Sequence, residues 1–357
     1  MTDILVIGGG IAGLSAAARL APHAQVTVLE AEGALGYHAS GRSAALFEQS
    51  YGLAPVRALS RASAAFHQPY LSPRGLMLVA RAGDEAAFEA DRADMGLTEI
   101  TTEAARAHVP ILNETVSRVA YHADAQDIDT DRMLQDFART VRTHGGQVVT
   151  GARVTGIEPG WRVATTAGAF DGKRIVNAAG AWADTIACMA GIKPIGIKPF
   201  RRSMARIPAP GGHDVSGWPM IFGVGETWYA KPDAGALLVS PADEDAADPH
   251  DAWADDMVLA HGLDRYMGHV TEPVTRVTST WAGLRSFAPD RVLVLGPDTA
   301  NRDFIWCAGQ GGYGFQTAPA ASQLLADLTL GHTPSLDPDT VEALVATRFS
   351  RASEPAQ

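Results

Sequence analysis

Residues 4–13 read Ile-Leu-Val-Ile-Gly-Gly-Gly-Ile-Ala-Gly, an apolar run that leads directly into a glycine-rich turn. The apolar run is typical of a buried parallel strand. Residues 14–20 favour a helix, which Pro22 stops, and residues 25–29 favour a second strand, which ends at Glu30. This order of strand, G-x-G-x-x-G turn, helix, strand and acid predicts a dinucleotide-binding site.

The glycines and the acid of this fingerprint have separate expected roles. Gly8 permits the tight turn, Gly10 lets the backbone approach a pyrophosphate, and Gly13 lets the helix pack closely on the strand. Glu30 stands where a carboxylate can accept hydrogen bonds from ribose hydroxyls. A glycine-rich turn in another α/β fold would not explain Glu30. The fingerprint alone leaves NAD and FAD open as the dinucleotide.

Length and composition describe an ordinary globular chain of 357 residues, with 46% hydrophobic and 19% charged residues. The formal net charge of −11 argues against nucleic acid and anionic membranes as partners. The two cysteines, Cys188 and Cys307, cannot build a disulfide framework, and a reducing cytoplasm is the expected location. We expect no membrane helix, no signal peptide and no metal site.

Beyond Glu30 the chain alternates between nucleotide-type segments and mixed or antiparallel segments. The nucleotide type returns in an amphipathic helix at 130–144, a strand at 173–178 and a helix at about 317–328. A hairpin is expected around 232–235, and a solvated loop with a helix start at 243–256. The alternation predicts an α/β fold (α+β overall), in which a Rossmann-like domain is interwoven with a substrate domain built on an antiparallel sheet. The expected bounds are 1–60, 130–197 and 285–357 for the first domain, and 61–129 and 198–284 for the second.

Several blocks of sequence in matching order resemble the D-amino-acid oxidase superfamily of flavoproteins, and within it the bacterial D-arginine dehydrogenases. The resemblance covers essentially the whole chain. It rests on the fingerprint with Glu30 and on residues 40–43, 177–182, 201–203, 229–235, 281–287 and 309–316. It implies FAD rather than NAD, held without a covalent bond because no cysteine stands where related enzymes attach the flavin.

The resemblance also implies which residues hold the cofactor. The fingerprint and the acid would bind the pyrophosphate and the adenosine ribose, residues near 154 and 180 would meet the adenosine half, and backbone N–H groups near 309–312 would reach the flavin. The expected cofactor residues are Gly8, Gly10, Ile11, Ala12, Gly13, Glu30, Ser40, Arg42, Ser43, Ala44, Val154, Ala179, Gly180, Trp182, Gly309, Gly311, Gly312, Tyr313 and Gly314.

The substrate implied by the resemblance is a D-amino acid, oxidised at its α-carbon to an imino acid that water converts to a 2-oxo acid and ammonia. A guanidinium fixes a carboxylate best through two hydrogen bonds, and Arg285 is the first candidate for this role. By resemblance Arg202 and the phenol of Tyr229 assist, although the sequence does not distinguish Arg202 from Arg201. The other expected members of the site are Tyr51 on a covering loop, the carbonyl of Gly312, and Gln316.

Leu46 and Leu76 stand where the D-arginine dehydrogenases carry polar groups for the substrate side chain. A cationic side chain would lose its charge partner there, so we expect a preference for neutral or apolar side chains. Glycine, N-methyl amino acids and 2-hydroxy acids remain alternative substrates, and a non-catalytic flavoprotein subunit is a further alternative. The electron acceptor, whether oxygen, a quinone or a dye, is left open.

Overall fold

The N-terminal fingerprint lies at the centre of a largely parallel sheet in the computed structural model, which describes residues 2–351. Strand β1 (Thr2–Ile7) pairs in parallel with β2 (Val26–Leu29) and β12 (Gly168–Asn177). Parallel β9 (Gln147–Val149) and β20 (Phe304–Ala308) extend the two sides. Antiparallel strands β10 (Val154–Glu158), β11 (Arg162–Thr165) and β19 (Val294–Pro297) complete it. Segments distant in sequence therefore converge on one nucleotide-type sheet.

Helices cover this sheet and bury its apolar strands. Leu14 of α1 (Ile11–Leu20), Met133 of α5 (Thr130–Thr143) and Leu325 of α8 (Gly314–Leu330) share one core cluster. The other described helices are α2 (Ala54–His67), α3 (Glu85–Met95), α4 (Thr102–His108), α6 (Ala183–Met189), α7 (Asp256–Met267), α9 (Pro338–Leu344) and α10 (Thr347–Arg351). No helix among residues 2–351 has the length and apolarity needed to cross a membrane.

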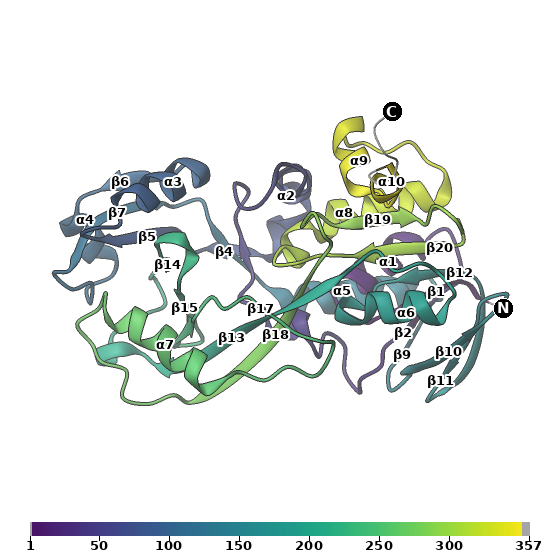
Figure 1. The fold of residues 1–357 in the computed structure, drawn as a ribbon, viewed down its shortest axis with the longest axis horizontal. Helices are drawn as coiled ribbons and strands as arrows, with labels where there is room; N and C mark the ends of the chain where they lie inside the picture. The colour runs from purple at the N-terminus through teal and green to yellow at the C-terminus, as the bar shows by residue number, and fades with distance from the viewer. Residues whose placement is uncertain (1, 352–357) are drawn as a thin grey trace.

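A second sheet forms the other lobe of the molecule (Figure 1). Its central strands run in the order β13 (Lys198–Pro208), β16 (Ala236–Ser240), β15 (Tyr229–Asp233), β14 (Met220–Gly223), β5 (Leu76–Arg81) and β7 (Val116–His122). Strands β6 (Thr98–Ile100), β17 (Asp245–Ala246) and β18 (Ser279–Phe287) lie at its margins. All of its pairs are antiparallel except β14 with β5. The small sheet of β3 (Leu46–Phe47), β8 (Gln126–Ile128) and β4 (Leu71–Pro73) is separate.

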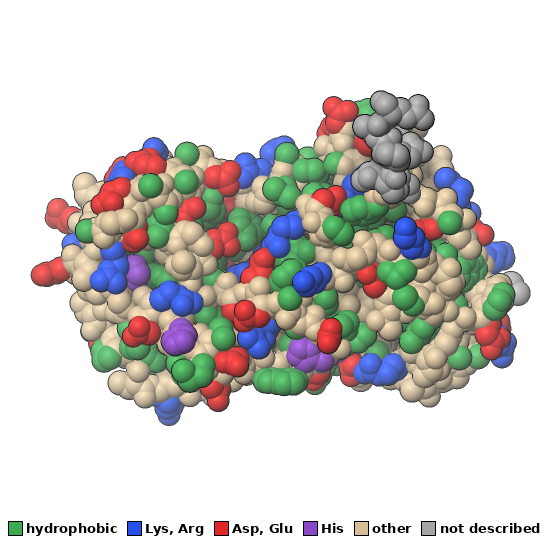
Figure 2. All heavy atoms as spheres, in the orientation of Figure 1, with side chains coloured by type: hydrophobic (Ala, Val, Ile, Leu, Met, Phe, Trp, Pro, Cys, Tyr) green, Lys and Arg blue, Asp and Glu red, His purple; other side chains and the backbone are tan. Residues whose placement is uncertain are grey.

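The expected fold class is confirmed, since a Rossmann-like sheet alternates along the chain with a mainly antiparallel one. The expected domain bounds stay a prediction, and β18 runs through the expected boundary at residue 285. Figure 2 shows acidic and basic side chains intermingled on one face of the molecule.

Two local expectations differ from the structure. The hairpin turn is at Ala234-Gly235, because Pro232 and Asp233 still belong to β15. The stretch 243–256 is more than a solvated loop, since the Asp243 side chain is 4% exposed and accepts hydrogen bonds from the backbone N–H and hydroxyl of Ser203. In addition, the segment that follows Glu30 contains a 3₁₀ turn, Ala39–Arg42.

Candidate active site

One elongated cavity of about 520 Å³ joins the fingerprint turn to the second sheet. Its first part is lined by the glycine-rich turn and Glu30, and its last part by β5, β14 and β15. The cavity brings together the great majority of the residues that the sequence singled out. Those that line it are Gly8, Gly10, Ile11, Ala12, Glu30, Ser40, Arg42, Ser43, Ala44, Leu46, Tyr51, Leu76, Val154, Ala179, Gly180, Trp182, Arg202, Tyr229, Arg285, Gly311, Gly312, Gly314 and Gln316.

The backbone of the fingerprint has the close approaches that a dinucleotide site needs. Gly8 has φ +113° and lies against the carbonyl of Ala178, so a side chain there would overlap backbone. A Cβ on Gly13 would overlap the carbonyl oxygen of Gly8, which explains how α1 packs so closely on β1. The start of α1 lines the cavity at the point where a pyrophosphate would bind, and the N–H of Ile11 donates to the hydroxyl of Ser40 at 3.0 Å.

Glu30 is buried at the end of β2, with its side chain fixed by backbone donors. One carboxylate oxygen accepts the N–H of Gly9 at 2.6 Å and the other accepts the N–H of Glu32 at 2.8 Å. A carboxylate has about four lone-pair positions, so acceptor capacity remains for ribose hydroxyls. These observations fit FAD in the first part of the cavity.

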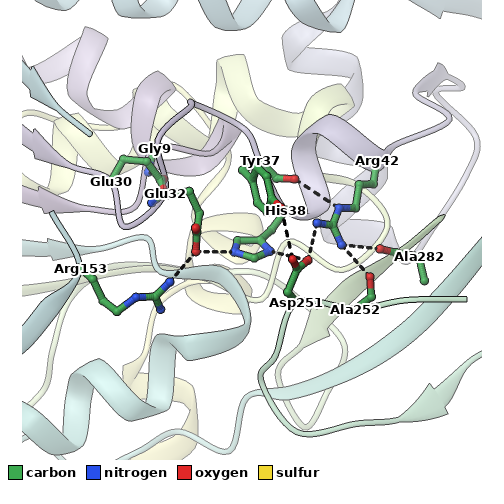
Figure 3. A network of polar contacts seen from close by, with 10 residues as sticks. All are labelled: Gly9, Glu30, Glu32, Tyr37, His38, Arg42, Arg153, Asp251, Ala252 and Ala282. Atoms are coloured by element: carbon green, nitrogen blue, oxygen red, sulfur yellow. Dashed lines mark hydrogen bonds and ion pairs between the residues drawn. The ribbon is translucent and has the colours of Figure 1, made fainter. Parts of the chain in front are cut away.

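A network of polar contacts lines the part of the cavity next to Glu30, where the adenosine half of FAD is expected (Figure 3). The carboxylate of Glu32 contacts Arg153 at 2.6 Å and the ring of His38 at 3.1 Å. Asp251, from the long loop after β17, pairs with Arg42 at 2.5 Å and with His38 at 3.7 Å. The network links the loop after Glu30 to a loop of the second lobe.

The guanidinium of Arg42 is largely occupied by protein partners. Its guanidinium donates hydrogen bonds to the carbonyls of Tyr37, Ala252 and Ala282 and to the carboxylate of Asp251. These contacts use its hydrogen-bonding capacity to hold the two loops together. Arg42 also lines the cavity, and its expected role at the cofactor stays a prediction.

The glycine segment 309–314 matches expectation only in part. Gly312 and Gly314 line the cavity, and α8 begins at Gly314, so the helix N-terminus faces this space. The N–H of Gly311 instead donates to the carbonyl of Ser286 at 2.8 Å, which removes it as a donor to a flavin. Gly13, Gly309 and Tyr313 lie outside the cavity lining.

Arg285 on β18 has the clearest unfilled bonding capacity in the site. Its side chain is 14% exposed, and its Nη1 makes a long ion pair of 3.8 Å with Glu244. Its buried Nε has no hydrogen-bond partner among residues 2–351. The guanidinium lies directly on Gly312, where any Cβ would overlap it. A buried guanidinium facing a cavity in this way is a ready-made site for a carboxylate.

The neighbouring arginines on β13 are separated by the alternation of the strand. Arg201 pairs with Asp243 at 3.2 Å and with Asp245 at 2.8 Å. Arg202 lines the cavity instead, with its guanidinium carbon 6.0 Å from the ring centre of Tyr229. The structure thus brings Arg202, and not Arg201, to the same space as Arg285 and Tyr229.

Tyr51 covers this part of the cavity from the loop before α2. Its hydroxyl donates to the carboxylate of Glu226 at 3.1 Å, and its ring centre lies 5.4 Å from that of Tyr313. Burial and the charge of Glu226 raise the pKa of Tyr51, so the phenol stays protonated. Glu226 has φ +50° in the turn before β15 and also lines the cavity. The sequence did not predict Glu226 as a site residue, because a single acid in a glycine-containing loop matches no motif.

The far end of the cavity is mostly apolar, with one buried acid. Its apolar residues are Leu46, Leu76, Met95, Met220 and Phe222. Glu48 lies among them, and its backbone N–H donates to the side-chain carbonyl of Gln316 at 3.4 Å. The buried Nε2 of Gln316 has no hydrogen-bond partner in the described part of the chain. This end can therefore hold a substrate side chain.

Comparison with known protein families supports the cofactor and the fold. The family model described as "FAD dependent oxidoreductase" matches residues 3–328. The chain is also similar to L-proline dehydrogenase from P. horikoshii, with a TM-score of 0.83, 24% identity and coverage of 99% of both chains.

Two curated relatives extend this picture. Glycine oxidase of Pseudomonas putida is 25% identical over 94% of this chain and 96% of its own length. Hydrogen cyanide synthase subunit HcnC of Pseudomonas aeruginosa is 26% identical over 63% of this chain, and the match spans 53% of that subunit. These similarities support the flavoprotein family and do not single out the D-arginine dehydrogenases.

Proposed function

The chain belongs to the FAD dependent oxidoreductase family, and from this premise we propose that it oxidises the α-carbon of D-amino acids with neutral side chains. The observation that carries the proposal is the buried Arg285 guanidinium, whose Nε has no partner among the described residues and which lies on Gly312 in the family's cofactor cavity. A group of this kind is paired or ligand-binding when buried, and an α-carboxylate matches its geometry.

In this proposal the residues of the cavity orient the substrate by its α-amino-acid end. FAD supplies the chemistry of hydride acceptance when bound. Arg285 holds the carboxylate, with Tyr229 and Arg202 beside it, and the carbonyl of Gly312 faces the amine. Tyr51 excludes water above them. The imino acid that results is hydrolysed to a 2-oxo acid and ammonia.

The apolar end of the cavity supports the preference for neutral side chains. Leu46 and Leu76 cannot pair with a cation, but they gain about 25 cal/mol for each Å² of apolar surface they bury. The D configuration rests on the resemblance to the D-arginine dehydrogenases. Glycine is the principal alternative substrate, favoured by the similarity to glycine oxidase.

We further propose that FAD is held without a covalent bond. Neither cysteine lines the cavity, and burial raises the pKa of the Cys307 thiol to about 12, which keeps it from acting as a nucleophile. Cys188 and Cys307 are both unpaired, which fits a reducing cytoplasm as the location.

Anaerobic mixing of the purified holoprotein with single substrates tests the function. We expect neutral D-amino acids to bleach the flavin absorbance faster than their L forms, glycine, sarcosine or 2-hydroxy acids. Faster bleaching by glycine would replace the proposed substrate. A flavin that stays oxidised with every compound would identify a non-catalytic subunit. Repeating the reaction in air shows whether oxygen accepts the electrons.

A further inference from the structure

Glu48 is a carboxylate placed at the apolar end of the substrate cavity, where the sequence left open whether an acid would replace the missing charge. Its side chain is 7% exposed, and it lines the cavity beside Leu46 and Leu76. An isolated carboxylate in such a place would be costly, so its partners determine what the cavity presents to a substrate.

The contacts of Glu48 hold it firmly in place. One carboxylate oxygen accepts the backbone N–H of Ser50 at 2.9 Å and the Ser50 hydroxyl at 2.6 Å. The other oxygen forms an ion pair of 2.7 Å with Nε2 of His122. His122 is directly opposite Leu76 in the pairing of β7 with β5, so the two side chains lie on the same face of the sheet.

We propose that His122 masks the charge of Glu48 and that the pair determines which substrate side chain is accepted. With an imidazolium at His122 the pair is neutral overall, and the cavity accepts a neutral side chain. When the imidazole loses its proton, the pair carries one negative charge, and the same cavity attracts a cationic side chain. This inference rests on the proposed function, because it assumes that the cavity end holds an amino-acid side chain.

The charges around the pair support this assignment. Glu48 raises the pKa of His122 above its ordinary value of 6.5 against the effect of burial, and Asp124 acts in the same direction. The imidazolium therefore persists to higher pH than that of an ordinary histidine.

Other carboxylates near the cavity have partners of their own. Asp127 pairs with Arg74 at 2.6 Å and with Lys231 at 2.8 Å. Asp94, at the end of α3, pairs with Arg57 at 2.7 Å, and Glu226 accepts the hydroxyl of Tyr51. Among these carboxylates, Glu48 is the one whose partner is a histidine, the side chain whose charge changes most readily with pH.

The test compares D-arginine with D-citrulline, a neutral side chain of almost the same shape. Both have the same α-amino-acid end, so deprotonation of the amine cancels in the ratio of their kcat/KM values. We expect this ratio to rise roughly tenfold as the pH increases from below 6.5 to well above it. A ratio that is flat across this range would overturn the inference, while reduction of the flavin by D-citrulline would still support the proposed function. A flavin that no amino acid reduces would instead overturn the proposed function.

Two near-isosteric variants identify the groups. His122→Gln removes the imidazolium that neutralises Glu48. The kcat/KM ratio of D-arginine to D-citrulline should therefore already be high at low pH and should not change with pH. Glu48→Gln removes the negative charge, and burial then lowers the pKa of His122, so the ratio should stay low and flat above pH 6.5. A ratio that rises with pH above 6.5 in either variant would contradict the assignment. If a variant fails to bind FAD, the wild-type profile still decides the question, together with NMR titration of the His122 ring, whose midpoint should lie above 6.5.

Discussion

The substrate anchor is a single side chain, Arg285, and its removal should affect binding of the carboxylate more than the fold. Truncating one partner of a buried charge pair costs about 2–5 kcal/mol, or roughly 30- to 4,000-fold in kcat/KM. We therefore expect Arg285→Ala to keep its flavin spectrum and to lose kcat/KM within that range. Arg139→Ala, at a site whose side chain is 71% exposed, is the matched control. Kinetics equal to the control would remove Arg285 from the site.

Gly312 should be nearly as sensitive, although it has no side chain. Any Cβ at this position would overlap the guanidinium of Arg285, so Gly312→Ala must displace the anchor. We expect a loss of at least about tenfold in kcat/KM, since small misplacements of positioning groups are costly. Gly33→Ala is the control, because a Cβ there meets no atom within 4 Å. Equal activity of the two variants would show that Arg285 does not bind as inferred.

The sequence predicts the role of a single residue where a motif determines its position. It does not do so where strand register brings the residue to the site. Gly8, Gly13 and Glu30 could be assigned because the chemistry of a dinucleotide requires them at that spacing. His122 could not, because only the pairing of β7 with β5 brings it beside the cavity.

Among the larger elements, the loop after β17 contacts the part of the cavity where adenosine is expected. It does so through the ion pairs of Asp251 with Arg42 and His38. Its contacts with Arg42 and His38 are partly exposed, and the Asp251 side chain is 55% exposed. Exposed ion pairs contribute about 0.2–1 kcal/mol, so Asp251→Asn should weaken FAD binding by at most roughly fivefold. Fluorescence titration of the apoprotein with FAD measures this change. The control is Asp248→Asn in the same loop; a larger loss in the control would exclude the role given to Asp251.

Local sequence patterns predicted most helices and strands, but not the ion pairs that the loop after β17 forms. Residues 130–143 have an apolar face that packs in the core, as their periodicity predicts. The acidic residues 243–251 have the composition of a solvated loop. The ion pair of Asp251 with Arg42 depends on the meeting of both lobes. The ion pairs with Arg201 and Arg202 depend on the pairing of β17 with β13, and composition encodes neither.

For the molecule as a whole, reversible binding of FAD should increase the free energy of unfolding. A ligand that binds only the folded state adds about 2.7 kcal/mol at one hundred times its dissociation constant. We expect the apoprotein to gain several degrees in Tm as FAD is added, and acid precipitation to leave the yellow colour in solution. Colour that stays with the precipitated protein would contradict non-covalent binding.

The Glu48–His122 pair should also make the stability of the whole protein depend on pH. The ion pair raises the pKa of His122 above 6.5, so its contribution is complete below pH 6.5 and is lost as the pH rises through the folded-state value. Burial favours the neutral form of Glu48, but the contacts with His122 and Ser50 outweigh it and lower its pKa below 4.5. The contribution of Glu48 is therefore present above pH 4.5 and is lost as the pH falls through the lower folded value.

The two effects define a window between pH 4.5 and pH 6.5 in which the pair stabilises the fold most. Glu48→Gln should lower stability there by about 1.5–3 kcal/mol, the usual range for hydrogen bonds to charged groups. Its difference in Tm from the wild type should shrink on either side of the window. Asp3→Asn removes an exposed pair with Lys173 and serves as the control, with a much smaller change. A difference for Glu48→Gln that grows steadily above pH 6.5 would mean that His122 is not the proton-carrying partner of Glu48.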